Sequence, residues 1–148
     1  AAIFRGAKYI LIGQESDADA RVQQFAALVA RIGAQPVWME AETHDWAVAI
    51  ASHLPQRVSV ALAQVVRDET DETGLPLNIA GPGLRDSLRL AGSPYEVWRD
   101  ICLTNSDNIG RALDRVAQAI EHLRTHLRSK ELEESFDAAN ELFRNLHE

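Results

Sequence analysis

The first forty residues alternate short apolar runs with one amphipathic segment. Residues 8–12 form an apolar run that predicts a buried strand. Apolar residues then recur at helical spacing as far as Gly33, and this predicts a helix capped by Ser16 or Asp17. A second strand is expected over residues 35–40. The pattern therefore predicts strand, helix and strand in that order.

Two strands joined by a helix do not make an independent sheet, because they leave unpaired edges and one uncovered face. The rest of such a sheet is expected upstream of Ala1. No convincing strand is predicted from Glu42 onward. The predicted fold class is therefore mainly α, with a short β-α-β segment followed by helices.

A long helix is predicted from about Thr43 to about Arg67, and its first half is too apolar to lie on a surface. It carries His53, and two residues later Pro55 removes one backbone hydrogen bond and should bend the helix. An imidazole and a kink at the same level of a buried helix favour a functional site there. The alternative is a hydrogen-bonded core histidine without a function in binding.

A glycine-rich segment over residues 81–89 is the second candidate. Gly81-Pro82-Gly83 is expected to break a short helix at residues 75–80 and to lead into a loop ending at Arg89. A guanidinium group can bind a carboxylate through two parallel hydrogen bonds. A plain turn with solvated charges is the competing interpretation. Neither the P-loop nor the dinucleotide glycine spacing is present.

The last third of the chain carries heptad patterning, with apolar residues at alternating intervals of four and three. Before it, Ser93 is expected to cap one helix, and Ser106 or Asp107 the next. Two heptad helices in tandem predict an antiparallel hairpin, and apolar surface left over predicts a homodimer through the C-terminal helices. Packing within the chain alone is the alternative. The heptad residues are Ile109, Leu113, Val116, Ile120, Leu123, Leu127, Leu132, Phe136, Ala139, Phe143 and Leu146.

Net charge, cysteine count and residue spacing exclude several classes of partner and site. The net charge of -7 argues against nucleic acid and against an anionic membrane surface as partners. Cys102 is the single cysteine, which fits a cytoplasmic protein. No Cys/His cluster has metal-ligand spacing. No Ser-His-Asp arrangement can be argued, because Ser52 and His53 are adjacent and point to different sides of a helix.

Four segments form an ordered series: His44-Asp45, then Ser52-His53-Leu54-Pro55, then residues 83–89, then Trp98-Arg99-Asp100-Ile101. This series resembles the C-terminal part of the prephenate/arogenate dehydrogenase family. Residues 4–11 also resemble the last stretch of the nucleotide domain of that family. The resemblance covers essentially the whole chain.

The resemblance implies a division of the chain into two parts. Residues 1–41 would be the remnant of an α/β nucleotide-binding domain, and residues 42–148 an all-helical substrate-binding and dimerization domain. It also implies the reaction, an oxidative decarboxylation of prephenate or arogenate in tyrosine biosynthesis. A hydride leaves the carbon bearing the ring hydroxyl for NAD or NADP, carbon dioxide departs, and the ring becomes aromatic.

Site residues carried over from the resemblance all belong to substrate binding. Arg89 would bind a substrate carboxylate, and His53 would line the pocket at the helix kink, so both are expected to face one shared hollow. The other implied residues are Asp86 and Gly83, which would shape the loop, Gln56, which stands where many relatives have a second histidine, and Trp98, for which a place in the core is the simpler interpretation.

No catalytic residue is assigned within the chain. The glycine-rich fingerprint of the family and its catalytic histidine in a His-Pro motif are absent from the sequence and are expected before Ala1. The chain alone is therefore expected to be inactive. The alternative from a different class is a stand-alone, non-catalytic helical dimerization or regulatory module of the same ancestry.

Overall fold

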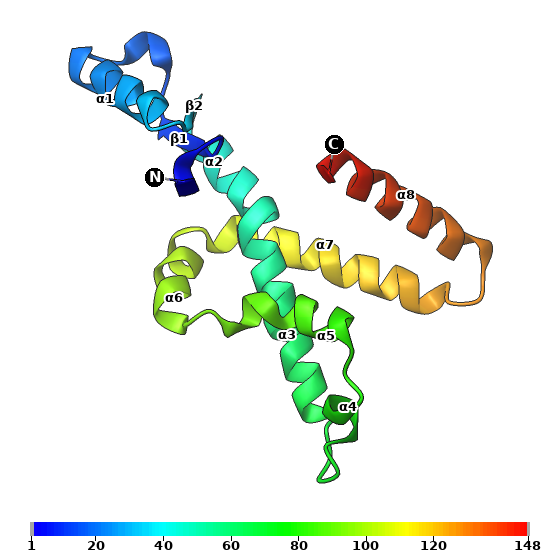
Figure 1. Ribbon diagram of the computed structural model, residues 1–148. Coiled ribbons are helices and arrows are strands. Elements are labelled where there is room, and N and C mark those ends of the chain that lie inside the picture. Colours follow the sequence, from blue (N-terminus) through cyan, green and yellow to red (C-terminus); the bar gives the residue numbers. More distant parts are fainter. Residues whose placement is uncertain (1, 148) are drawn as a thin grey trace.

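The computed structural model describes residues 2–147, and it opens with a β-α-β unit. After a 3-10 turn, η1 (Ala2–Phe4), strands β1 (Lys8–Ile12) and β2 (Gln35–Met39) pair in parallel, as the crossover through helix α1 (Ala20–Arg31) requires. The predicted strand, helix and strand are confirmed. Figure 1 shows this unit at one end of the long central helix.

The predicted cap of α1 is wrong. Ser16 and Asp17 lie in a 3-10 turn, η2 (Glu15–Asp17), and the chain is extended again before the helix starts. Asp19 caps α1, because its Oδ1 accepts hydrogen bonds from the backbone N–H groups of Arg21 and Val22 at 2.8 and 2.9 Å.

The long helix consists of three segments in direct succession: α2 (Ala41–Val48), a π-helical turn η3 (Ala49–His53) and α3 (Leu54–Asp68). In η3 the ladder widens, so that the N–H of Leu54 bonds to the carbonyl of Ala49. Pro55 follows directly and has no N–H to place in the ladder. The irregularity that Pro55 predicts is therefore a π-helical turn that ends at His53.

Three short helical segments follow, and the last two of them pack back on α3. They are α4 (Leu75–Asn78), α5 (Pro82–Leu88) and the 3-10 turn η4 (Arg89–Gly92). Ser59 of α3 holds α5 and η4 in place, because its hydroxyl donates to the carbonyl of Ser87 at 2.7 Å and accepts from the N–H of Ala91 at 3.0 Å. The prediction of a loop over residues 81–89 is wrong. Pro82 instead starts α5, because its fixed φ suits the first position of a helix.

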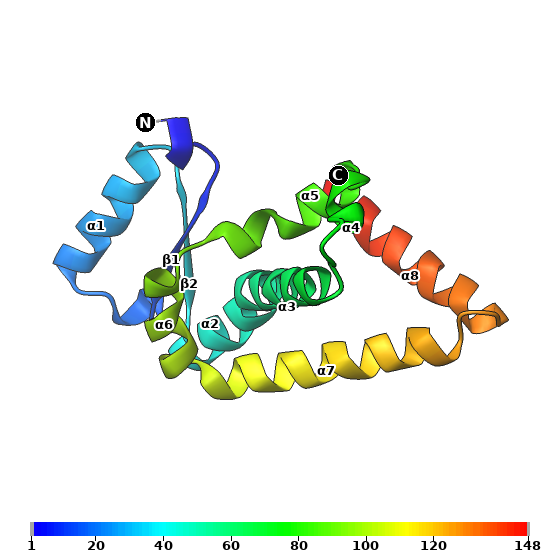
Figure 2. The same ribbon diagram turned by 90° about the horizontal axis from the view of Figure 1, so that it is seen from below.

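Helix α6 (Tyr95–Thr104) leads into α7 (Ser106–Thr125), which crosses the long helix at η3 (Figures 1 and 2). Two predicted caps are wrong here. Pro94 rather than Ser93 precedes α6, and Asn105 rather than Ser106 or Asp107 precedes α7. At the crossing, the buried apolar residues are Ala49, Ile109 and Ala112.

Helix α8 (Lys130–His147) reverses direction after α7, but the predicted antiparallel hairpin is not closed. Figure 1 shows α8 standing away from the helices that precede α7, and none of the extensive contacts between elements among residues 2–147 involves it. Phe136 and Phe143, at the centre of its heptad pattern, are 62% and 60% exposed. The heptad positions of α7 and α8 are therefore not paired with one another. Of the helices between residues 2 and 147, none is both long and apolar enough to cross a membrane.

Candidate functional site

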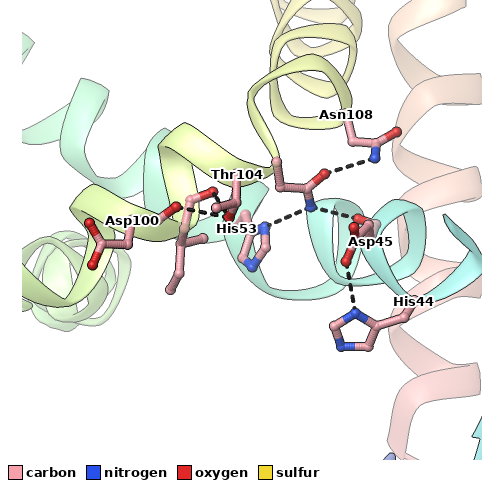
Figure 3. Close-up of polar contacts among 8 residues, drawn as sticks. His44, Asp45, His53, Asp100, Thr104 and Asn108 are labelled. Atoms are coloured by element: carbon pink, nitrogen blue, oxygen red, sulfur yellow. Dashed lines mark hydrogen bonds and ion pairs between the residues drawn. The ribbon is translucent and has the colours of Figure 1, made fainter. Parts of the chain in front are cut away.

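His53 ends the π-helical turn and is buried, with 9% of its surface exposed, where α6 and α7 meet the long helix. Asn105, in the junction between α6 and α7, reaches across to it. The Nδ2 of Asn105 donates to the carbonyl oxygen of Asp45 at 2.7 Å and lies 3.4 Å from the Nδ1 of His53 (Figure 3). The ring of Trp98 meets the imidazole edge-on, with centroids 5.9 Å apart. Asn105 and Trp98, both distant from His53 in sequence, thus fix the imidazole.

The direction of the hydrogen bonds around His53 follows from one residue that can only donate. The Nη2 of Arg111 lies 2.6 Å from Asn108, so the atom of Asn108 that faces it is the amide oxygen. The Nδ2 of Asn108 then donates to the Oδ1 of Asn105 at 2.7 Å (Figure 3). The Nδ2 of Asn105 is therefore a donor to the Nδ1 of His53. Because Nδ1 accepts, the neutral imidazole carries its proton on Nε2.

The charge state of His53 agrees with this tautomer. Burial lowers the pKa of His53 from its ordinary value of 6.5, and the neighbouring His44 and Arg57 lower it further, whereas Asp45 raises it. The Oδ1 of Asp45 lies 2.9 Å from the Nδ1 of His44 (Figure 3). His53 is therefore neutral at pH 7, with Nε2–H as its remaining donor.

A cavity of about 250 Å³ opens beside the imidazole. His53 lines this cavity, and its Nε2 has no hydrogen-bond partner among residues 2–147 and is not a fully enclosed atom. The cavity is lined by residues of α2, η3, α6 and the α6–α7 junction. The polar ones are His44, Asp45, Ser52, His53, Thr104 and Asn105, and the apolar ones are Val48 and Ile101. Such a mixed lining suits a small ligand that has both polar and apolar parts.

Trp98 carries a second unpaired donor. Its Nε1 is buried and has no hydrogen-bond partner in the described part of the chain. An unpaired buried N–H costs about 1–3 kcal/mol. The guanidinium of Arg57 lies over the Trp98 ring, 5.1 Å from its centroid, while its Nε donates at 2.6 Å to Gln56, which is only 2% exposed. Gln56 is thus buried and Trp98 half-buried beside His53.

The structure separates Arg89 from His53. Arg89 begins η4, is exposed, and has no hydrogen-bond or ion-pair partner among residues 2–147; it is not one of the residues that line the His53 cavity. The reason is the docking of η4 at Ser59, which lies six residues, or about 9 Å along a helix, beyond His53. The expected shared hollow is therefore not formed within this chain.

The two other residues expected near Arg89 are also exposed. Gly83 and Asp86 lie on α5 rather than in a loop, so neither shapes a loop. A Cβ atom placed on Gly83 would meet no atom within 4 Å, so the packing of this chain does not require glycine there. The roles of Gly83, Asp86 and Arg89 in substrate binding stay predictions.

Sequence reasoning missed Asn105, Arg57 and Ser59. Asn105 had a recognisable signal, since asparagine is typical of the position before a helix. Its side chain, however, makes no capping hydrogen bond and is used instead to join Asp45 to His53. Neither Arg57 nor Ser59 stands out in sequence, because a single polar residue in a helix shows which face it occupies only once the helix is packed.

The residues at the carboxyl ends of the two strands do not fit a dinucleotide. A hollow of about 420 Å³ lies there, and its charged lining residues are Asp17, Asp19 and Glu40. Three carboxylates repel a pyrophosphate, which binds where backbone N–H groups and cations converge. Residues 2–147 also contain no group of three His, Cys, Asp or Glu side chains placed to hold a metal ion.

Comparisons with known proteins agree on one family. Residues 40–147 match the family described as "Prephenate dehydrogenase, dimerization domain". The chain is 33% identical over 135 residues to prephenate dehydrogenase of Bacillus subtilis, and this match covers 90% of this chain and 36% of that protein. It is 32% identical over 101 residues to cyclohexadienyl dehydrogenase of Zymomonas mobilis, covering 68% of this chain and 34% of that protein.

Solved structures extend the similarity to nearly the whole chain. Prephenate dehydrogenase from Aquifex aeolicus, solved with hydroxyphenyl propionate and NAD+, has a TM-score of 0.81 at 25% identity and covers 98% of this chain. Synechocystis arogenate dehydrogenase has a TM-score of 0.72 at 28% identity and covers 97%. The chain spans 51% and 50% of those two structures, and about a third of the curated relatives above.

Proposed function

Since the chain belongs to the prephenate/arogenate dehydrogenase family, in which it covers the dimerization-domain region, we propose that it is the substrate-binding and dimerization part of such an enzyme. The proposed reaction is the NAD- or NADP-dependent oxidative decarboxylation of prephenate or arogenate in tyrosine biosynthesis. Residues 1–41 are the end of the nucleotide-binding domain and residues 42–148 the helical domain. The protein forms a homodimer through its C-terminal helices.

The observation that carries the substrate-binding proposal is a pair of donors without acceptors. The Nε2–H of neutral His53, a residue that lines the cavity, is unpaired among residues 2–147, and so is the buried Nε1–H of Trp98, which lies beside His53 but does not line the cavity. Prephenate and arogenate carry a ring hydroxyl and carboxylates, whose oxygens accept hydrogen bonds. A neutral imidazole donates to such an oxygen without adding a buried charge, which would be costly.

Arg89 provides a positive charge for a substrate carboxylate. It is exposed and unpaired in the described chain, and a charge-assisted bond to a substrate carboxylate contributes roughly 1.5–3 kcal/mol. Because Arg89 does not line the His53 cavity, this role requires a substrate that extends out of the cavity or a closer approach of η4. Gly83 and Asp86 are assigned to the same carboxylate-binding surface on α5.

The direct test of substrate binding is calorimetric titration of this chain with prephenate and with arogenate. Binding of one of them is expected, with His53→Ala abolishing it. His122→Ala removes an exposed histidine of α7 and is the matched control, expected to bind as the unchanged chain does. The absence of heat at millimolar concentrations of both substrates would count against a preformed site.

A stand-alone dimerization or regulatory module is the second candidate. The acidic hollow at the ends of β1 and β2 favours it, because these residues do not hold a pyrophosphate. The two proposals differ in the product of the complete reading frame. NAD(P)+-dependent decarboxylation of prephenate or arogenate by that product supports the enzyme, and a product without activity on either substrate supports the module.

A further inference from the structure

A small hollow lies between the long helix and α7, separate from the His53 cavity. It has a volume of about 160 Å³. Trp46 and Ile50 of the long helix form one wall, and they are 60% and 47% exposed. Helix α7 supplies the other lining residues, which are Asn108, Arg111, Ala112 and Arg115. None of these six residues lines the His53 cavity.

The two arginines of this hollow carry positive charge that the described chain does not neutralise. Arg111 and Arg115 lie one turn apart on α7, where like charges repel each other. Neither is within ion-pair distance of a carboxylate among residues 2–147, although Asp114 lies between them in sequence. Arg115 makes no hydrogen bond in this part of the chain, and Arg111 uses only its Nη2, on Asn108. The free donors of both guanidinium groups indicate an anion as the ligand.

The wall formed by Trp46 and Ile50 indicates that this anion has an apolar part. An exposed indole offers a flat apolar surface on which an aromatic ring can lie. The volume of about 160 Å³ matches that of a cavity that takes one benzene molecule, about 150 Å³. A carboxylate attached to a ring can place its two oxygens on the guanidinium groups while the ring contacts Trp46. The lining therefore fits a small aromatic carboxylate better than an inorganic anion.

A chain of hydrogen bonds joins this hollow to His53. The Nη2 of Arg111 donates to the Oδ1 of Asn108 at 2.6 Å, and the Nδ2 of Asn108 donates to the Oδ1 of Asn105 at 2.7 Å. The Nδ2 of Asn105 lies 3.4 Å from the Nδ1 of His53 (Figure 3). Asn108 lines the hollow and Asn105 lines the His53 cavity, so a single hydrogen bond connects the two linings. Because Arg111 sets the direction of both amides, a ligand that displaces its guanidinium alters the contact with His53.

We propose that this hollow binds a small aromatic carboxylate, and that its occupation is transmitted to His53 through the two asparagines. The carboxylate bonds to Arg111 and Arg115, and the ring lies against Trp46. This site lies outside the proposed function, because none of its residues is assigned to prephenate or arogenate. The hollow can bind its ligand whether or not the His53 cavity binds a substrate, so the two proposals can fail separately.

Benzoate is the simplest probe of this site, and calorimetric titration of the unchanged chain measures its binding. Arg115→Gln is expected to weaken binding at least tenfold, because a charge-assisted hydrogen bond is lost. Arg124→Gln removes an arginine of the same helix outside the hollow, so it is the matched control and should bind as the unchanged chain does. Equal binding by the two variants, or no heat at millimolar benzoate, would overturn the site.

Two further titrations test the ring and the place of binding. Acetate, which has no ring, should bind at least tenfold more weakly than benzoate, and equal binding would show that Trp46 takes no part. His53→Ala should still bind benzoate. Binding that is lost in His53→Ala but kept in Arg115→Gln would place benzoate in the His53 cavity and overturn the site in the hollow, while the proposed substrate site stands.

Nitrogen NMR of the His53 imidazole tests the transmission. Benzoate should shift the His53 signals in the unchanged chain and in Arg124→Gln, but not in Arg115→Gln at the same benzoate concentration. Without benzoate, Arg111→Ala should shift these signals, because Asn108 loses the donor that fixes its orientation, whereas Arg115→Gln should leave them unaltered. Benzoate binding that depends on Arg115 but leaves the His53 signals unaltered would overturn the transmission to His53.

Discussion

Substituting Asn105 by alanine is the sharpest test of the hydrogen-bond network around His53. Asn105 is 7% exposed, and its side chain joins α2, η3 and α7. Alanine keeps the backbone before α7 and removes only the amide. Because the side chain makes no capping bond, loss of a helix cap does not confuse the result.

The cost of Asn105→Ala can be worked out from the bonds that are lost. Two have good geometry, to the carbonyl of Asp45 and from Asn108, each 2.7 Å, while the 3.4 Å bond to His53 is long and contributes little. The Asp45 carbonyl keeps a second partner, the N–H of Ala49, so it is not left unpaired. Two bonds at about 0.5–1.5 kcal/mol each give a loss of about 1–3 kcal/mol.

Urea unfolding at fixed protein concentration measures this loss. With a denaturant slope of about 2 kcal/mol/M, a loss of about 2 kcal/mol lowers the midpoint by roughly 1 M. Asn140→Ala, on the exposed surface of α8, is the matched control and should change stability by no more than about 0.5 kcal/mol. Nitrogen NMR of the imidazole gives a second readout: Asn105→Ala should relax the preference for the Nε2–H tautomer. If neither the midpoint nor the His53 signals differ from those of Asn140→Ala, the argued hydrogen-bond direction is wrong.

Three further predictions concern the site. The pKa of His53 is lower in the folded chain than the ordinary 6.5, so the unfolded chain takes up the proton first as the pH falls. The contribution of neutral His53 to stability is therefore complete above pH 6.5 and is lost between pH 6.5 and the lowered pKa. The difference in urea midpoint between the unchanged chain and His53→Gln should shrink toward acid across this window, and a constant difference would contradict the assignment. Arg89→Ala should weaken substrate binding at least tenfold in calorimetry. Arg85→Ala, which removes an exposed arginine of the same segment, is the control. Equal weakening by both changes would show that the net charge of the segment, and not a specific contact of Arg89, is responsible. Trp98→Phe removes the unpaired Nε1, so it should destabilise the fold far less than the roughly 3–5 kcal/mol typical of a Trp→Ala change. It should nevertheless weaken substrate binding in the same titration. Unaltered binding would mean that the Nε1 does not contact the substrate.

The sequence was sufficient for those parts of the fold that depend on local periodicity. Residues 8–12 and 35–39 alternate with a helical stripe, and the structure pairs them as two parallel strands around a helix. The errors occur where several polar residues compete for one cap, as at Ser16, Asp17 and Asp19. They also occur at Pro82, which breaks a helix when internal and starts one when first.

The site was predictable only in part, because its contacts are made across the fold. Pro55 identified the level of the irregular turn, and His53 lies there as the pattern indicated. Asn105, 52 residues away, could not be linked to His53 without knowing that α7 crosses the long helix at η3. Arg89 could not be placed either, since its position depends on the bond between Ser59 and the backbone of η4.

The proposed substrate site depends on how α7 crosses the long helix. His53 ends η3 and lies at this crossing, while Asn105 immediately precedes α7 and holds the imidazole. A change in the angle at which α7 crosses η3 would therefore move Asn105 relative to His53. Packed elements move as units rather than deform freely, so contacts made further along α7 influence the position of Asn105. The helical domain that we assign to the homodimer thus contains the crossing that orders the imidazole assigned to the substrate.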